Sequence, residues 1–103
     1  MGKNKLARFE ENRKLPNVIQ PTREEALGNF ELKGKWRERV FKNNNPIVLE
    51  FGCGKGEYSV GMAKAFPDKN FIGVDIKGAR FWFGAKEAVE KGLNNAAFLR
   101  TQI

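Results

Sequence analysis

One stretch decides the fold of this 103-residue chain: Val48-Leu49-Glu50-Phe51-Gly52-Cys53-Gly54-Lys55-Gly56. Residues 47–49 are apolar without polar alternation and follow Pro46, so they predict a short buried strand. Three glycines at alternate positions then allow a tight turn and leave room for a ligand where a Cβ would collide. Helical spacing begins at Glu57. A strand, a glycine loop and a helix in this order are typical of the nucleotide-binding corner of an open α/β sheet.

The spacing of the glycines argues against a dinucleotide ligand. A dinucleotide-binding loop has the pattern G-x-G-x-x-G and aims its helix N-terminus at a pyrophosphate. Here Glu57 stands where the third glycine of that pattern belongs, and Glu50 adds a second carboxylate at the end of the strand. Two carboxylates suit a ligand with an ammonium or sulfonium group better than one with phosphates. An NAD-dependent oxidoreductase is therefore disfavoured.

The chain continues with an alternation of helices and strands. The expected elements are a helix over 57–66, a strand over 71–74, a helix over 80–91 and a strand over 96–99. With the strand before the glycine loop, this order is half of a doubly wound sheet. We therefore expect an α/β fold, the N-terminal half of a Rossmann-like and mostly parallel sheet. Its third strand is expected to have an open edge.

The segment before the glycine loop carries most of the positive charge. The chain has a net charge of +7, and residues 1–46 contain eleven Lys and Arg against six Glu. We assign residues 1–29 to a basic, partly disordered arm and residues 30–103 to the half domain. The arm is either a solvated tail or a segment that becomes ordered on RNA phosphates. In the second case its RNA-binding residues are Lys3, Lys5, Arg8, Arg13 and Lys14.

Local signals predict further structure in this segment. Residues 18–21 are expected to be extended, because Pro21 restricts the residue before it. Residues 22–25 have the pattern of a capping box for a short helix, and residues 35–42 predict a longer one.

Side chains at the strand ends form the candidate ligand site. Asp75 follows Gly56 by 19 residues and ends the second strand, where a carboxylate accepts bonds from ribose hydroxyls. Ile76 is placed to lie against an adenine, and the amide of Gln102 can donate to and accept from an adenine edge. Plainer interpretations stay open: a turn cap for Asp75, an exposed strand end for Gln102 and an ordinary glycine-rich turn for the loop.

The residue types that are rare or missing exclude other chemistry. Cys53, the single cysteine, excludes an internal disulfide and indicates a reducing compartment. We interpret it as a small loop residue, because no base is at hand to activate it. Without histidine there is no imidazole base, and we expect no metal. No apolar stretch has transmembrane length and the N-terminus lacks a signal-peptide core, so we expect a cytoplasmic protein without a membrane partner.

Several motifs together resemble those of one enzyme family. The E-x-G-x-G-x-G arrangement of residues 50–56 resembles motif I of the class I S-adenosylmethionine methyltransferases. Over about residues 30–103 the chain is similar to the bacterial tRNA (guanine-N7-)-methyltransferases. The motifs that carry this likeness are residues 33–36, 45–47, 49–56, 62–64, 67–75 and 92–95.

The resemblance implies a fold, a cofactor and a substrate. They are the N-terminal half of a class I methyltransferase fold, S-adenosylmethionine, and guanine N7 in the variable loop of tRNA. Glu50, Asp75 and Gln102 match family positions that contact the cofactor, with glutamine in place of the usual aspartate. The expected cofactor-binding set is Glu50, Gly52, Cys53, Gly54, Gly56, Asp75, Ile76 and Gln102.

No catalytic residue is expected within the chain. The family's F-x-D-P-W-like motif would lie beyond Ile103, so the 103-residue chain by itself is expected to be inactive. Three alternatives stay open: a methyltransferase for another RNA, one for a small molecule, and a non-catalytic RNA-binding subunit that keeps the fold. A small-molecule enzyme would have no use for the basic N-terminus. The sequence indicates no particular oligomeric state.

Overall fold

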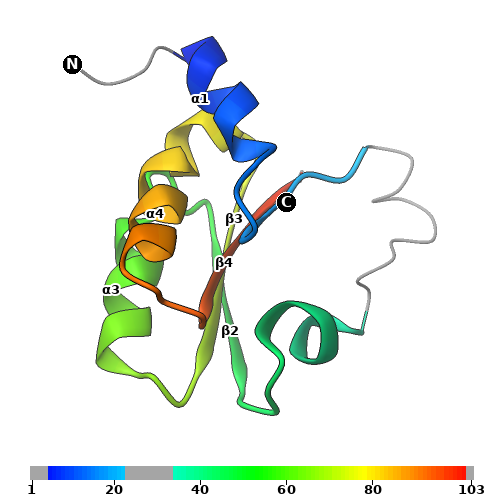
Figure 1. Cartoon of the computed structure of the whole chain (residues 1–103), viewed down its shortest axis with the longest axis vertical. Helices are drawn as coiled ribbons and strands as arrows, with labels where there is room; N and C mark the ends of the chain where they lie inside the picture. The colour runs from blue at the N-terminus through cyan, green and yellow to red at the C-terminus, as the bar shows by residue number, and fades with distance from the viewer. Residues whose placement is uncertain (1–4, 23–33, 102–103) are drawn as a thin grey trace.

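A computed structural model of the chain describes residues 5–22 and 34–101. The elements in chain order are α1 (Lys5–Asn12), β1 (Val18–Ile19), η1 (Trp36–Phe41), β2 (Ile47–Phe51), α3 (Glu57–Ala65), β3 (Asn70–Asp75), α4 (Gly78–Glu90) and β4 (Ala96–Arg100). The strands form one parallel sheet in the order β1-β4-β3-β2. Helices α3 and α4 cover one face, and the π-helical turn η1 lies on the other (Figure 1). The α/β fold class expected from the sequence is confirmed.

The strands and helices around the glycine loop agree with the expected pattern. The strands expected over 47–49, 71–74 and 96–99 are β2, β3 and β4, and α3 follows the loop at Glu57. The expectation that residues 47–49 are buried was wrong: Val48 and Leu49 are 40% and 50% exposed, because β2 is an edge strand. Helix α4 begins at Gly78, two residues earlier than expected. Residues 23–25 of the expected capping box lie outside the described residues.

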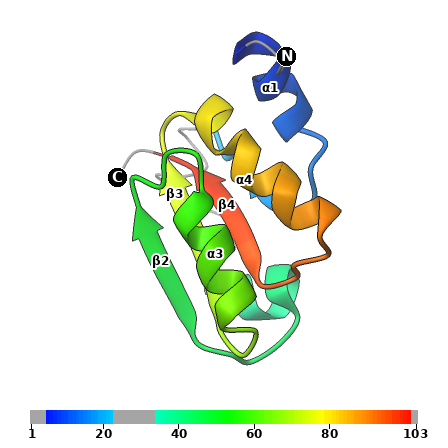
Figure 2. The same cartoon turned by 90° about the vertical axis from the view of Figure 1, so that its left-hand side faces the viewer.

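Parallel pairing places the ends of these strands together. Val48 is opposite Phe71, and Phe71 is opposite Ala96, so β2, β3 and β4 run side by side in the same direction. Figure 2 shows their arrows pointing to the edge where the glycine loop connects β2 to α3. Residues that follow these strands therefore meet at one edge of the sheet.

The N-terminal segment differs from its expected form. In its described part, residues 5–22, the arm contains helix α1 and strand β1. Helix α1 lies beside α4 (Figure 2), and β1 pairs with Phe98 and Leu99 of β4. Leu15 and Val18 pack against the hydrophobic core, and burial of these apolar side chains favours an ordered segment despite its basic composition. Residues 5–22 therefore pack on the sheet and on α4. Residues 1–4 and 23–29 lie outside the described residues.

The edges of the sheet also differ from the expectation. The third strand, β4, was expected to have an exposed edge, but β1 covers it. Within the described residues, the two edge strands are β1, which has two residues, and β2, which has five. The expectation was wrong because pairing of β1 with β4 joins segments about 80 residues apart, which no local pattern shows.

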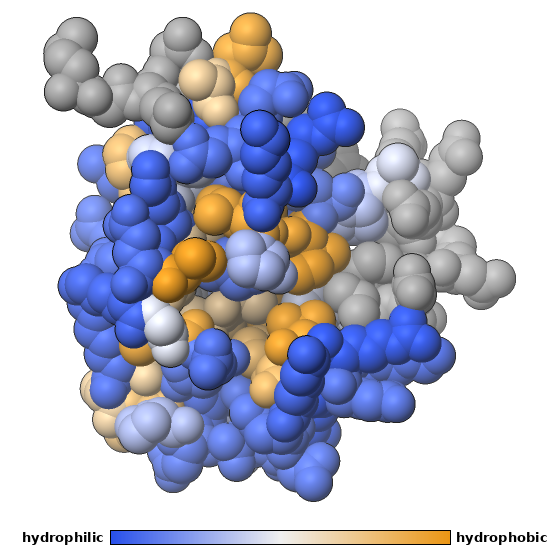
Figure 3. All heavy atoms as spheres, viewed as in Figure 1, coloured by the Kyte–Doolittle hydropathy of each residue, from blue (hydrophilic) through white to orange (hydrophobic). Residues whose placement is uncertain are grey.

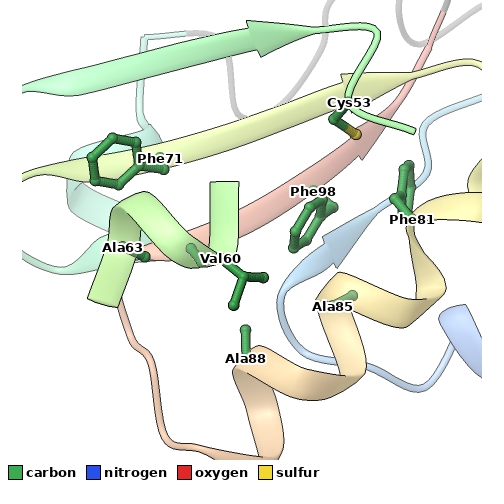
Figure 4. Packing of buried hydrophobic residues seen from close by; sticks show 9 residues of the cluster. Cys53, Val60, Ala63, Phe71, Phe81, Ala85, Ala88 and Phe98 are labelled. Carbon is green, nitrogen blue, oxygen red and sulfur yellow. The ribbon is translucent and has the colours of Figure 1, made fainter. Parts of the chain in front are cut away.

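The main core lies between the sheet and the helices α3 and α4. Phe81 and Phe98 stack at its centre with ring centroids 5.4 Å apart, and both are fully buried (Figure 4). Ala85 and Ala88 of α4 face the same cluster, and their small side chains let the helix approach the sheet closely.

A second cluster lies on the opposite face of the sheet. Phe41 of η1 packs there against Ile72, Val74 and Ala97, with Trp36 and Val40 at its margin. Next to it lies an apolar hollow of about 460 Å³, whose lining includes Trp36, Leu49 and Phe51. Figure 3 shows hydrophobic residues gathered in the middle of the view, with hydrophilic residues around them.

Candidate functional site

The glycine loop is fastened to the end of β3. The carbonyl oxygen of Val74 accepts hydrogen bonds from the N–H groups of Gly52 (2.7 Å) and Cys53 (3.1 Å). Gly52, Gly54 and Gly56 have φ angles of 71°, 58° and 81°. These values lie in the left-handed region that side chains disfavour. Backbone geometry therefore requires the three glycines found from the sequence.

Gly56 also meets a packing requirement. A Cβ on Gly56 would lie 2.6 Å from the ring of Phe98, and one on Gly84 would lie 2.8 Å from the carbonyl oxygen of Lys55. The N–H of Gly84 donates to that same oxygen at 2.9 Å. The loop and α4 therefore cross with no room for a side chain. Gly84 was missed by the sequence analysis, because its role depends on this crossing rather than on a local pattern.

Asp75 bridges the loop and the start of α4. Its Oδ2 accepts from the N–H of Gly54 at 2.9 Å, and its Oδ1 accepts from the N–H of Lys77 at 3.0 Å. Burial by itself raises the pKa of this carboxyl, but those hydrogen bonds and the positive charge of Arg80 outweigh it, so the pKa lies below its ordinary value. Asp75 is 8% exposed and its ionised carboxylate is held in one orientation. The remaining lone pairs can accept bonds from ligand hydroxyls.

Glu50 is held by a residue that the sequence analysis missed. The hydroxyl of Ser59, which is buried in the first turn of α3, donates to Oε1 of Glu50 at 2.5 Å. This bond orients the carboxylate at the tip of β2. The position of Ser59, three residues after Gly56, was the available signal, because the first turn of a helix after a glycine loop faces the strand before it.

Cys53 is part of the glycine loop, and its buried thiol is unreactive. Burial raises the pKa of its thiol to about 12, and the negative charges of Asp75 and Glu50 act in the same direction. The thiol therefore stays protonated near neutral pH, and a protonated thiol is a poor nucleophile. This agrees with its interpretation as a small loop residue.

Two further side chains lie at the same edge. Arg80 has its Nη2 3.6 Å from the place where a Cβ on Gly54 would lie, and its charge acts on Asp75. Arg80 was not among the residues predicted from the sequence, although its position in the first turn of the helix after Asp75 was a signal. Ile76 is 46% exposed beside Asp75. Gln102 lies outside the described residues.

The basic residues of the N-terminal segment lie mainly on α1 and just after it. Lys5, Arg13 and Lys14 are exposed, and Arg13 pairs with Glu10 at 3.5 Å. Lys3 lies outside the described residues. Arg8 places its guanidinium 4.9 Å from the ring centroid of Phe83.

Phe83 joins this helix to the glycine loop. It is 38% exposed, and the ammonium group of Lys55 lies over the same ring at 5.5 Å, so cations from α1 and from the loop converge on it. Phe81 and Trp82, its neighbours, are buried and belong to the core.

Residues 5–22 and 34–101 contain neither a metal-binding cluster nor a membrane-spanning helix. In those ranges no three His, Cys, Asp or Glu residues are grouped so that they could hold a metal ion. No helix in the same ranges is both long and apolar enough to cross a membrane.

Comparison with known proteins gives strong sequence similarity to one set of enzymes. The chain is 71% identical over 103 residues to the tRNA (guanine-N(7)-)-methyltransferase of Christiangramia forsetii, with 99% of this chain and 46% of that protein covered. It is 56% identical to the enzyme of the same name from Bacteroides fragilis, with 100% and 41% covered. For the Streptococcus suis enzyme the identity is 46%, with 68% and 32% covered. The chain thus spans less than half the length of each of these relatives.

A solved structure and a family profile are also similar to this chain. The fold is similar to the crystal structure of coclaurine N-methyltransferase bound to N-methylheliamine and SAH, with a TM-score of 0.53. Identity to that protein is 14%, over 99% of this chain and 38% of that one, so the likeness concerns the fold. Residues 44–103, which include β2, the glycine loop and everything after it, match the profile of the family described as "Putative methyltransferase". Since this match covers more than half of its residues, the chain belongs to that methyltransferase family.

Proposed function

We propose that the complete protein uses S-adenosylmethionine to methylate guanine N7 in the variable loop of tRNA. The observation that carries the proposal is the ionised carboxylate of Asp75, fixed by the N–H of Gly54 at the end of β3. The relatives, which are named for this activity and reach 71% identity, support it. A cytoplasmic location goes with this substrate and is part of the proposal.

The residues at the carboxyl edge of the sheet fit this cofactor. A Cβ on Gly52 would meet no atom within 4 Å, so the space beside the loop is open to a ligand. Two carboxylates, Glu50 and Asp75, are oriented by hydrogen bonds at the tips of neighbouring strands. We assign Glu50 to the ammonium group, Asp75 to the ribose hydroxyls and exposed Ile76 to the adenine. The loop residues Gly52, Cys53, Gly54 and Gly56 would line the site, and Gln102 remains a prediction.

The chemistry requires little from this part of the protein. The bound cofactor supplies a methyl group activated by a sulfonium, and guanine N7 carries a free lone pair that needs no prior deprotonation. Catalysis can then rest on alignment of the two and on stabilisation of the positive charge that develops on the purine. Glu50 and Asp75 serve the alignment by fixing the cofactor. We assign no catalytic residue to the described part and expect the 103-residue chain alone to be inactive.

The basic surface of the N-terminal segment suits the proposed tRNA. Lys5, Arg13 and Lys14 are exposed, and Arg8 lies close to them on α1. Cations spaced along α1 and the residues just after it can follow a phosphate backbone. Since Lys55 and Arg8 share the ring of Phe83, this surface continues to the glycine loop. RNA held there would lie close to the cofactor.

The cofactor site is tested by replacing Asp75. Asp75→Ala in the complete protein should weaken binding of S-adenosylhomocysteine by about 1.5–3 kcal/mol, because charge-assisted hydrogen bonds to the ribose are lost. The matched control is Asp68→Ala, which removes an exposed aspartate outside the site and should leave the affinity unchanged. Unchanged affinity in Asp75→Ala, measured by calorimetric titration, would contradict the assignment.

The substrate is tested separately. Unmodified tRNA incubated with the complete protein and labelled cofactor should yield labelled N7-methylguanosine. Label at another position would redirect the proposal to another methyltransferase. Binding of tRNA without any label incorporation would favour the non-catalytic RNA-binding subunit.

The RNA surface is tested by substitution rather than deletion, because α1 is packed on α4. Replacing Arg13 and Lys14 by alanine should reduce the slope of log affinity against log salt by about two and weaken tRNA binding. Both side chains are exposed, so the fold should be unaffected. An unchanged salt slope would remove these residues from the RNA surface.

A further inference from the structure

Gly78, the first residue of α4, is enclosed by side chains from distant parts of the chain. A Cβ at this position would lie 3.0 Å from Cδ of Arg100, 3.1 Å from Oε1 of Gln20 and 3.5 Å from Nδ2 of Asn12. Gln20 and Asn12 belong to the N-terminal segment. The start of α4, three residues after Asp75, therefore rests against the segment expected to be a separate arm.

Asn12 makes the direct connection. Its side chain is fully buried at the end of α1, and its Nδ2 donates to the carbonyl oxygen of Gly78 at 2.7 Å. Its Oδ1 has no hydrogen-bond partner among the described residues. A buried amide oxygen without a donor costs free energy, whereas a leucine of similar volume would have no such cost. Stability alone is therefore a poor reason for an asparagine at this position.

The bond to Gly78 continues into the candidate cofactor site. Lys77, which adjoins Gly78, donates its N–H to Oδ1 of Asp75, and Oδ2 of Asp75 accepts from Gly54. The N–H of Lys77 belongs to the peptide unit 76–77 and the carbonyl of Gly78 to the unit 78–79, so Asp75 and Asn12 anchor the two ends of the turn 75–78.

We propose that Asn12 is a positioning residue for the cofactor: it holds the turn 75–78 in the geometry in which Asp75 binds the ribose. This inference rests on the proposed use of S-adenosylmethionine. It also predicts linkage, because α1 ends at Asn12 and the proposed RNA contacts Arg13 and Lys14 follow at once. tRNA that steadies this end of α1 should strengthen cofactor binding, and the cofactor should strengthen tRNA binding by the same factor.

The test is Asn12→Leu in the complete protein, titrated with S-adenosylhomocysteine. Loss of the bond to Gly78 should weaken binding about three- to tenfold, and the KM for the cofactor should rise while kcat changes little. The strengthening of cofactor binding by tRNA should also be lost. The matched control is Glu11→Gln, which removes the neighbouring ion pair to Lys86 (3.3 Å) and loosens α1 from α4 without touching Gly78. This control should retain wild-type affinity.

A second variant approaches the contact from the other side. Gly78→Ala places a methyl group against Asn12, Gln20 and Arg100. It should weaken binding of S-adenosylhomocysteine as Asn12→Leu does. If Asn12→Leu fails to fold, the affinity of Gly78→Ala tests the proposal in its place. Wild-type affinity in a folded variant, with or without a lower melting temperature, would make the contact merely structural and overturn the inference, while the proposed function would stand. Failure of the wild-type protein to bind S-adenosylhomocysteine would overturn both.

Discussion

The two sides of the sheet differ in how much of their apolar surface is covered by other elements. On the β1 side, the residues Ala96, Ala97 and Phe98 of β4 are at most 3% exposed. Strand β1 pairs with Phe98, helices α3 and α4 cover one face of β4, and η1 covers the other. On the β2 side, Leu49 and Phe51 are 50% and 61% exposed. Both strands are apolar in sequence, so the difference comes from what lies beside them.

The candidate site contains one residue from a central strand and one from an edge strand. Apolar side chains exposed on a parallel edge strand form a surface that further protein usually covers. The site lies between the two sides: Asp75 on central β3 is fixed by backbone groups, whereas Glu50 on edge strand β2 is held by a single hydroxyl. The predictions below test how far each side depends on its packing.

The largest effect on stability is expected where the glycine loop packs against Phe98 of β4. Gly56→Ala should destabilise the protein by about 3 kcal/mol, since a Cβ would lie 2.6 Å from Phe98 and the φ of 81° strains any side chain. Denaturant unfolding measures this. Gly61→Ala is the control, because a Cβ there meets no atom within 4 Å, and it should stabilise α3 by up to about 1 kcal/mol. Equal stability of the two variants would show that the crossing is not tightly packed.

A smaller effect is expected at the tip of the edge strand. Ser59→Ala should weaken binding of S-adenosylhomocysteine by about 1–2 kcal/mol, because Glu50 loses the hydroxyl that orients it. Tyr58→Phe removes a hydroxyl from the exposed neighbouring residue and should have no effect. If both variants bind like the wild type, Glu50 needs no support from α3.

The outer surface of the helical layer should matter still less. Glu87 of α4 pairs with Lys64 and Lys91 at 2.8 Å, and hydrogen bonds from these lysines lower the pKa of Glu87 to about 2. Glu87→Gln should cost about 0.5 kcal/mol or less near neutral pH, because its side chain is 38% exposed and solvent screens the pair.

The pH dependence gives the check on this pair. A carboxyl with a lowered pKa contributes stability that is present above its unfolded value near 4.5 and is lost as the pH falls toward 2. Wild type and Glu87→Gln should therefore differ in unfolding free energy near pH 7 and converge at about pH 2. A constant difference over this range would assign the effect to packing.

The smallest effect on folding is expected at the open edge. Phe51→Lys should change the unfolding free energy of the 103-residue chain by less than about 0.5 kcal/mol, because Phe51 is largely exposed. A lysine on an edge strand opposes pairing between chains, so light scattering of the isolated chain should decrease. Phe83→Lys, a similarly large change away from the edge, should not decrease it. Unchanged scattering in Phe51→Lys would locate self-association elsewhere.

The extent to which sequence predicted this molecule varies from element to element. The three strands at residues 47–51, 70–75 and 96–100, and the helices between them, follow from apolar runs and helical spacing. The position of Asp75 at a strand end was equally accessible. The order of the N-terminal segment was not, because α1 is basic and its docking on α4 depends on a partner more than 60 residues away.

By itself the sequence determined the strand, glycine loop and helix, and the carboxylates at the tips of β2 and β3. These features depend on backbone preferences and periodicity within a few residues, which a short segment carries with it. Only the tertiary structure decided that β1 pairs with β4, that Ser59 holds Glu50, that Gly84 leaves room for the loop and that Asn12 supports the start of α4. Each of these is a contact between segments that are brought together only when the core forms, so no local pattern encodes it.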